Sequence, residues 1–170
     1  MAGKAAKLKR RVNLYPPFLG AGIRIRHIAD DLRTIEVEMP LRFWNKNYVG
    51  THFGGSLYSM CDPFLMIMLI NNLGPDYIVW DKAATIRFKK PGRSTLYAAF
   101  KLDQEEIDQI HNELSHTESI DRVYNIDLTD EKGTTCATVE KVIHIRRKQE
   151  NQPARDKVSL EKESDSGEST

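Results

Sequence analysis

The stretch that decides the fold runs from Asn45 to Pro63 and reads NKNYVGTHFGGSLYSMCDP. It passes from a polar, glycine-rich loop directly into an apolar segment with the spacing of a helix. One carboxylate, that of Asp62, stands beside Pro63 inside that segment. An ionisable side chain on a core helix is costly unless it has a partner or a chemical task, so this stretch predicts a functional site.

We predict one helix from Ser56 to Asn72. Its apolar positions cover more than one stripe, which is typical of a helix surrounded by protein: Leu57, Met60, Cys61, Phe64, Leu65, Met68 and Leu69. In mid-helix, Pro63 would remove a hydrogen bond at a cost of about 3 kcal/mol and bend the helix, so that Asp62 points out of the core. The alternative is that Pro63 begins a second helix after a short break, and the sequence favours neither.

Segments with a period of two surround this helix and predict strands. They are residues 22–28 and 34–40 before the helix, and residues 76–90, 94–102, 122–128 and 134–145 after it. Residues 103–114 have the pattern of a surface helix, with a capping box at Asp103 and Glu106. The order β-β-α-β-β-(α)-β-β predicts an α+β fold in which an antiparallel sheet of about six strands wraps one long central helix.

The 170 residues are predicted to form one folded domain with two flanking segments. Residues 1–21 hold a basic helix over 4–14 and a proline-rich entry, residues 22–147 the domain, and residues 148–170 a disordered polar tail. The basic helix either packs on the edge of the domain or touches a lipid surface. Packing is favoured, because so short an amphipathic helix binds membranes weakly.

Composition excludes several classes of function. Lys plus Arg number 25 against 24 for Asp plus Glu, so no global charge indicates nucleic acid as a partner. Cys61 and Cys136 lie in apolar stretches without metal-ligand spacing, which indicates buried thiols, a cytoplasmic location and no metal site. The longest apolar run, residues 64–70, is far shorter than the roughly 20 residues of a membrane span, so no stable membrane insertion is expected.

The glycine-rich stretch also carries a family signature. The pattern Asn-x-x-Gly-x-x-His-Gly-Gly, six residues, then Asp is matched at Asn47, Gly50, Gly54, Gly55 and Asp62. The chain therefore resembles the hot-dog-fold acyl-CoA thioesterases, in particular relatives of the phenylacetate-degradation thioesterases. Phe53 stands where that branch has histidine. The stretches GTHFGGSLY and DYIVWDKAATIRFKKPGR are closer still to an uncharacterised bacterial branch of the superfamily.

The resemblance implies a hot-dog fold and an acyl-CoA or other acyl thioester as substrate. Hot-dog domains pair edge to edge into one continuous sheet, which implies a homodimer, or a homotetramer built as a dimer of dimers. No bound cofactor is expected, because coenzyme A enters only as part of the substrate.

The residues of the motif support the same chemistry. Free N–H groups where Gly54 begins a helix suit a carbonyl oxygen that becomes an oxyanion. Asp62, desolvated on an apolar helix, is expected to have a raised pKa and to act as a general base or nucleophile. Eight helical residues separate the two by about 12 Å, whereas each must come within about 3 Å of the reacting atoms. We therefore expect Asp62 of one subunit to face Gly54 of the partner subunit across a two-fold axis.

Asn47 is a third catalytic candidate. By the resemblance it holds the attacking water or the thioester carbonyl, and by its residue type it could instead make local turn bonds. The substrate-binding candidates are His52, Phe53, Gly55, Asp81, Lys82, Lys90 and Arg93. His52 either replaces the missing motif histidine or is a loop histidine bound by the backbone.

The remaining candidates have equally plain alternatives. Asp81 falls where related thioesterases place a serine, and Lys82 faces the other side of that strand, so a structural Asp–Lys feature is as well supported as catalysis. Lys90 and Arg93, in a basic turn, could bind the phosphates of coenzyme A or be solvated charge.

The leading hypothesis is an acyl thioester hydrolase. In it water attacks the carbonyl, Asp62 is the base or nucleophile, and the Gly54 N–H stabilises the oxyanion. A non-catalytic acyl- or acyl-CoA-binding protein is the alternative that Phe53 favours. A hot-dog dehydratase or hydratase is weaker, because no histidine–acid pair is evident.

Overall fold

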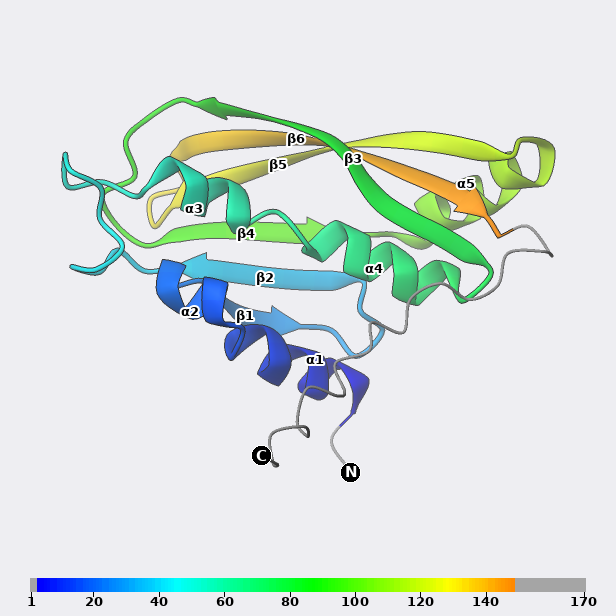
Figure 1. Cartoon of the computed structure of the whole chain (residues 1–170), viewed down its shortest axis with the longest axis horizontal. Helices are drawn as coiled ribbons and strands as arrows, with labels where there is room; N and C mark the ends of the chain where they lie inside the picture. Colours follow the sequence, from blue (N-terminus) through cyan, green and yellow to red (C-terminus); the bar gives the residue numbers. More distant parts are fainter. Residues whose placement is uncertain (1–2, 149–170) are drawn as a thin grey trace, which may run out of the picture.

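The computed structural model describes residues 3–148, which form a six-stranded antiparallel sheet curved around two consecutive helices (Figure 1). The strands are β1 (Arg24–Ile28), β2 (Thr34–Met39), β3 (Tyr77–Phe88), β4 (Leu96–Lys101), β5 (Ser119–Asp130) and β6 (Thr135–Arg147). The helices are α1 (Lys4–Asn13), α2 (Pro16–Ala21), α3 (Gly54–Ser59), α4 (Phe64–Leu73) and α5 (Gln104–His116). The strand order in the sheet is β1-β2-β4-β5-β6-β3. The predicted order of elements and the α+β fold class are confirmed.

The central helix is interrupted rather than continuous. After α3 the main chain tightens, and the Asp62 N–H donates to the carbonyl of Ser59, three residues earlier, at 3.3 Å. Pro63, which has no N–H to donate, then stands at the N-cap of α4. The alternative in which the proline begins a second helix is therefore correct, and the side chain of residue 62 lies at the junction of two helices.

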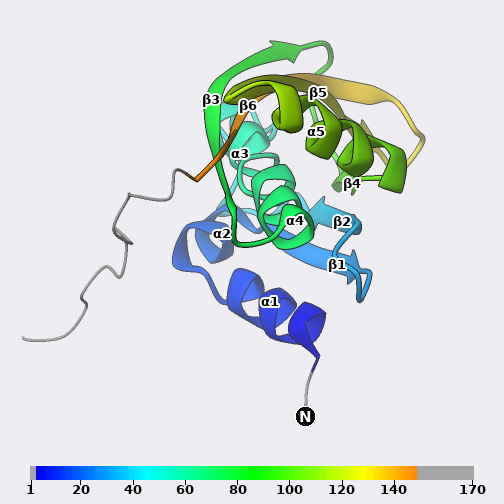
Figure 2. The ribbon, with the colours of Figure 1, turned by 90° about the vertical axis from the view of Figure 1, so that its right-hand side faces the viewer.

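The core lies between α4 and the concave face of the sheet (Figure 2). Phe64, in the first turn of α4, has no exposed surface, and its ring centroid lies 5.0 Å from that of Phe100 on β4. On the other side the ring of Phe18 from α2 lies 6.0 Å away. Pro16 and Pro17 follow the end of α1 and occupy the first turn of α2, where a missing N–H costs nothing.

Surface helix α5 confirms the helix predicted over residues 103–114. The Asp103 side chain caps it by accepting a hydrogen bond of 2.8 Å from the Glu106 N–H. Ile107, Ile110 and Leu114 form its buried stripe. Of the polar tail predicted over residues 148–170, all but Lys148 lies outside the described residues.

The two edges of the sheet differ. Along β1, helix α1 takes up free backbone groups: the Asn13 side chain accepts from the Ile25 N–H at 2.7 Å and donates to the Ile25 carbonyl at 3.4 Å. Lys9 donates to the carbonyl of Arg26. The predicted packing of the N-terminal helix on the domain edge is confirmed. At the other edge, β3 pairs only with β6 within residues 3–148, and its outer side is left unpaired there (Figure 2).

Candidate active site

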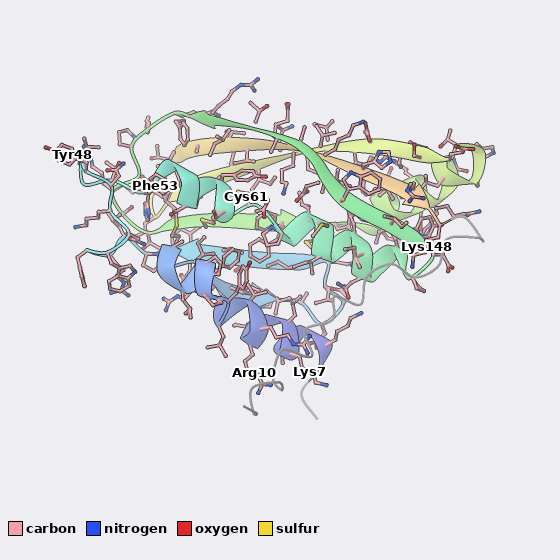
Figure 3. The ribbon with its side chains drawn as sticks, viewed as in Figure 1. Lys7, Arg10, Tyr48, Phe53, Cys61 and Lys148 are labelled. Atoms are coloured by element: carbon pink, nitrogen blue, oxygen red, sulfur yellow. The ribbon has the colours of Figure 1, made fainter. Side chains whose placement is uncertain are left out.

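A buried lysine meets Asp62 at the junction of α3 and α4. The ammonium of Lys141, on β6, is fully buried and lies 3.6 Å from Asp62 Oδ1. It also donates a hydrogen bond to the main-chain carbonyl of Asp62 and one of 2.8 Å to Asp81 Oδ2. In Figure 3 the label of Cys61 marks this junction, in the middle of the molecule. Lys141 thus joins the helix junction to the two carboxylates.

The expectation that Asp62 is desolvated is not met within the single chain. Its side chain is 49% exposed, whereas that of Lys141 is completely buried. The reason is the break after α3, which turns the carboxylate out of the apolar stripe and toward solvent. Within one chain, Asp62 is therefore an accessible carboxylate held from beneath by a cation.

Sequence reasoning missed Lys141, although a signal was present. The strand alternates, and Lys141 shares its inward face with Val139 and Ile143, which are fully buried. A lysine at an inward position of a central strand is almost never found buried without a partner. That pattern alone indicates an inward-facing carboxylate somewhere in the fold.

Asp81 takes part in an Asp–Lys feature, but its partner is Lys141 rather than the adjacent Lys82. The register between β3 and β6 shifts after Asp81, and Lys82 points to the other side, where it pairs with Asp121 at 2.6 Å. This pair, with a further hydrogen bond from His144, lowers the pKa of Asp121. The side chain of Lys82 therefore points away from the carboxylates of Asp62 and Asp81.

Tyr58 and Cys61 complete the surroundings of Asp62. Burial, followed by the hydrogen bond and negative charge of Asp62, raises the pKa of Tyr58 to about 12. Burial raises the pKa of the Cys61 thiol to about 12 as well. Both groups hold their protons at neutral pH, so neither supplies an anion for attack on a carbonyl. This leaves the carboxylates of Asp62 and Asp81 as the candidate bases of this cluster.

Two clefts lie beside the start of α3. The larger, of about 480 Å³, runs along Gly55, Ser56 and Ser59 and is closed on the other side by α2 and Trp44. The smaller, of about 360 Å³, includes Gly54 and the turn that follows β3. The N–H groups of Gly54 and Gly55 bind no acceptor within residues 3–148. Donors for an anion are thus present beside both clefts.

Aromatic rings explain both glycines at this helix start. Phe53 is the N-cap of α3, and a Cβ built at Gly55 would lie 2.5 Å from its ring. A Cβ built at Gly54 would lie 3.1 Å from the Phe88 ring. At position 53 the thioesterases that the sequence resembles have histidine. Here the position is Phe53, whose ring packs on the start of α3.

Asn47 is committed to its own loop. Its Nδ2 donates to Thr51 Oγ1 at 2.8 Å and to the His52 carbonyl at 3.2 Å, while its Oδ1 accepts from the N–H groups of Val49 and Thr51. Both amide hydrogens are used in these bonds. The side chain lines both clefts, but its bonds are those of a turn-forming residue.

Replacing Asn47 by alanine is expected to lower the free energy of unfolding by about 1–3 kcal/mol, because the buried Thr51 and the carbonyl of the buried His52 lose their partner. Urea denaturation measures this effect. Asn125→Ala, at an exposed position of β5, is the control and should change stability by less than about 0.5 kcal/mol. Unaltered stability of the Asn47 variant would mean that these bonds contribute nothing to the fold.

His52 is buried and belongs to the same loop. Its Nε2 donates to the Ser94 carbonyl at 2.9 Å, and its Nδ1 has no partner among the described residues. Burial lowers the pKa of His52, and the bond to Ser94 offsets this only in part. Of the two alternatives for His52, the structure therefore supports the second, a loop histidine bound by the backbone.

The lowered pKa predicts an acid-sensitive contribution to stability. Below about pH 6.5 the unfolded chain binds a proton at His52 that the folded chain refuses, so stability falls as pH falls toward the folded pKa. The slope from one such group is at most about 1.4 kcal/mol per pH unit. We expect His52→Gln to lose less stability than the parent between pH 7 and pH 5 in urea denaturation. His27→Gln, at an exposed position, should follow the parent; a parallel course of both variants would contradict the prediction.

The basic turn after β3 lies beside the smaller cleft. Lys90 lines it together with Gly54, and the N–H groups of Lys89 and Lys90 are anchored on the carbonyl of Cys136. Arg93 is exposed a few residues further on. Of the two, Lys90 thus lies where a ligand in the smaller cleft could reach it.

Eight of the predicted residues gather at three places. Asp62 and Asp81 meet at Lys141; Asn47, His52, Gly54 and Lys90 line the smaller cleft; and Phe53 and Gly55 line the larger cleft. Lys82 and Arg93 belong to none of these groups.

Comparison with known protein families shows to which family the chain belongs. The model of a domain of unknown function, DUF4442, matches residues 3–145. The chain belongs to the DUF4442 family. No curated protein matches this sequence.

Solved structures share the fold of this DUF4442 protein. PA5026 of Pseudomonas aeruginosa, described as a protein of unknown function and probable thioesterase, is 20% identical with a TM-score of 0.74, over 86% of this chain and 98% of its own. The thioesterase HI1161 of Haemophilus influenzae is 15% identical, with a TM-score of 0.62 over 86% and 93%. Thioesterase superfamily member 2 of the mouse is 16% identical, with a TM-score of 0.59 over 85% and 98%. The DUF4442 protein thus has the hot-dog fold that its sequence predicted.

Proposed function

We propose that this DUF4442 protein hydrolyses acyl-CoA or another acyl thioester. The observation that carries the proposal is the half-exposed carboxylate of Asp62, placed at a helix junction over the buried ammonium of Lys141, in a fold that thioesterases share. Water attacks the thioester carbonyl while Asp62 takes its proton, and the carbon–sulfur bond then breaks to release the acid and the thiol. Direct attack by the Asp62 carboxylate is the second form of the same proposal.

The oxyanion is stabilised by the free N–H of Gly54 on a second subunit. Within one chain, Gly54 begins α3 and Asp62 lies beyond its other end; the six residues of α3 alone span about 9 Å, which is too far for both to contact one carbonyl group. The unpaired edge of β3 favours two-fold pairing, because the β1 edge is already taken by α1. Such a dimer would also cover the exposed side of Asp62.

The two clefts divide the substrate between them. Lys89 and Lys90, which line the smaller cleft, supply cations for the phosphates of coenzyme A, and Arg93 follows in the same turn. Trp44 and Phe53 give the larger cleft an apolar part for an acyl chain, beside the polar side chains of Asn45, Lys46, Ser56 and Ser59. This division supports a coenzyme A thioester rather than a small uncharged ester.

Hydrolysis is tested with purified protein and acyl-CoA substrates of short to long chain, by detecting the free thiol of released coenzyme A. Turnover of at least one chain length above the rate without protein supports the proposal. Absence of thiol release across the whole series would refute it. Sizing of the same preparation tests the dimer.

A second candidate function, binding of acyl groups without catalysis, is favoured by Phe53. The ring occupies the position of the motif histidine and packs on the start of α3. Saturable binding of an acyl-CoA without thiol release would identify this function. Hydration of an enoyl-CoA, followed by absorbance, would instead indicate the hydratase chemistry of other hot-dog proteins.

A further inference from the structure

Charge is strongly segregated along the chain. The net charge is only +1, yet residues 3–29 and 39–61 contain no Asp or Glu. The first of these segments alone holds seven Lys and Arg residues, at positions 4, 7, 9, 10, 11, 24 and 26. The second adds Arg42 and Lys46. The carboxylates that balance these cations lie elsewhere in the sequence. In the fold Arg24 pairs with Glu38 of β2 at 2.6 Å, so the segregation of charge persists chiefly at α1.

The cations of α1 face away from the domain. The inner side of the helix is used against β1, where Ala5 is buried and Asn13 binds the strand edge. Lys4, Lys7, Arg10 and Arg11 are exposed. Figure 3 shows Lys7 and Arg10 on the side of α1 turned away from the sheet. None of these four side chains has an acidic partner within residues 3–148.

Large apolar side chains stand exposed next to these cations. Leu14 and Tyr15, directly after α1, are 64% and 53% exposed, and Leu19 on α2 is 52% exposed. Phe43 and Trp44, 85% and 54% exposed, stack edge to face at 4.9 Å in the loop after β2. We call these five residues, with the four exposed cations of α1, the α1–α2 surface.

The members of this surface from distant parts of the chain lie together. Leu19 and Trp44 line one hollow of about 250 Å³, together with Arg24 and Arg42. Trp44 also walls the larger cleft that runs along α3. The aromatic loop and α2 therefore form one continuous face, which borders the opening of that cleft.

We infer that the α1–α2 surface docks the protein peripherally on a membrane that contains anionic phospholipids. Exposed aromatic and leucine side chains beside unpaired lysine and arginine residues suit the boundary between acyl chains and anionic headgroups. An acidic protein would satisfy the cations, but it would leave Leu14, Leu19 and Phe43 without an apolar environment. None of the described helices is long and apolar enough to cross a membrane, so docking here means contact with the surface.

Membrane docking does not depend on the proposed function. What docking would do for catalysis does depend on it. If the protein hydrolyses acyl thioesters, the mouth of the larger cleft at Trp44 would lie at the lipid surface, where long-chain acyl compounds accumulate. Vesicle binding and thiol release are separate measurements, so failure of one leaves the other intact.

The test uses the full chain with Trp80→Phe, which leaves Trp44 as the only tryptophan. Vesicles of phosphatidylcholine alone are compared with an equimolar mixture of phosphatidylcholine and phosphatidylglycerol. We expect at least about tenfold stronger binding to the mixture in sedimentation, with a blue shift of Trp44 emission. Binding should weaken in about 1 M salt, where the Debye length is about 3 Å.

Two pairs of variants separate the contributions. Arg10→Gln with Arg11→Gln should weaken binding by about tenfold or more, whereas Lys101→Gln with Lys132→Gln, the same charge change at exposed positions outside the surface, should not. Leu19→Ser with Phe43→Ser should also reduce binding at least about tenfold, whereas Val123→Ser on the outer sheet face should not. No binding to the mixture, or binding that survives loss of Leu19 and Phe43, would overturn the inference, and the second result would mean that the cations alone adsorb to the anionic lipid.

Discussion

Replacing Asp62 by asparagine is expected to lower the turnover of acyl thioesters by about 10²- to 10⁴-fold, because the amide can neither accept the proton of water nor attack the carbonyl. The fold should persist. Asp62 is half exposed, and Lys141 keeps its closer bond of 2.8 Å to Asp81 when the Asp62 charge is removed. Steady-state thiol release measures the turnover, and urea denaturation of the same preparation measures whether the fold is kept.

Asp76→Asn, at an exposed position before β3, is the matched control and should retain full turnover. If the Asp62 variant turned over as fast as the parent, this carboxylate would have no place in the reaction. Hydrolysis by the parent would in that case have to use another base, of which Asp81 is the nearest.

The second large effect is expected at Lys141. Lys141→Met removes a fully buried cation and leaves the carboxylates of Asp62 and Asp81 facing an apolar group. Removal of one partner from a buried ion pair typically costs 3–5 kcal/mol. Asp81 remains 23% exposed and can recover some hydration, so we expect the lower end, about 3 kcal/mol. Urea denaturation measures the loss.

Removing the partner as well should restore much of this stability, because no buried charge is then left unpaired. The double variant Asp81→Asn with Lys141→Met is therefore expected to be more stable than Lys141→Met alone. Lys101→Met, an exposed lysine on β4, should change stability by less than about 0.5 kcal/mol. Equal stability of the single and double variants would show that charge pairing is not what holds Lys141 in place.

The strands were predictable from sequence because burial alternates along them. On β2, for example, Ile35, Val37 and Met39 are buried and the residues between them are not, so the period of two reports the sheet directly. The cap of α5 was predictable for a similar reason, since Asp103 and Glu106 interact within one turn. Interactions that are local in sequence leave a local signature.

The central helix was harder to predict, because both alternatives at Pro63 fit the same local pattern. The Asp62 carbonyl, at the break, is bound by Lys141, which lies 79 residues later in the chain. No window around Pro63 contains that partner. The role of Asn47 was left open for a related reason. The motif gives only the residue type at this position, whereas the four hydrogen bonds of the Asn47 side chain depend on how the loop folds.

The attachment of α1 to β1 limits how copies of this protein can join. A sheet with two free edges can add neighbours on both sides without end, and such growth yields fibres. Here Asn13 and Lys9 bind backbone groups of Ile25 and Arg26 on the β1 edge, so within residues 3–148 β3 offers the free edge. A pair formed through β3 has no further edge to offer, and assembly by strand pairing stops at two. Detachment of α1 would remove that stop and allow open-ended polymers.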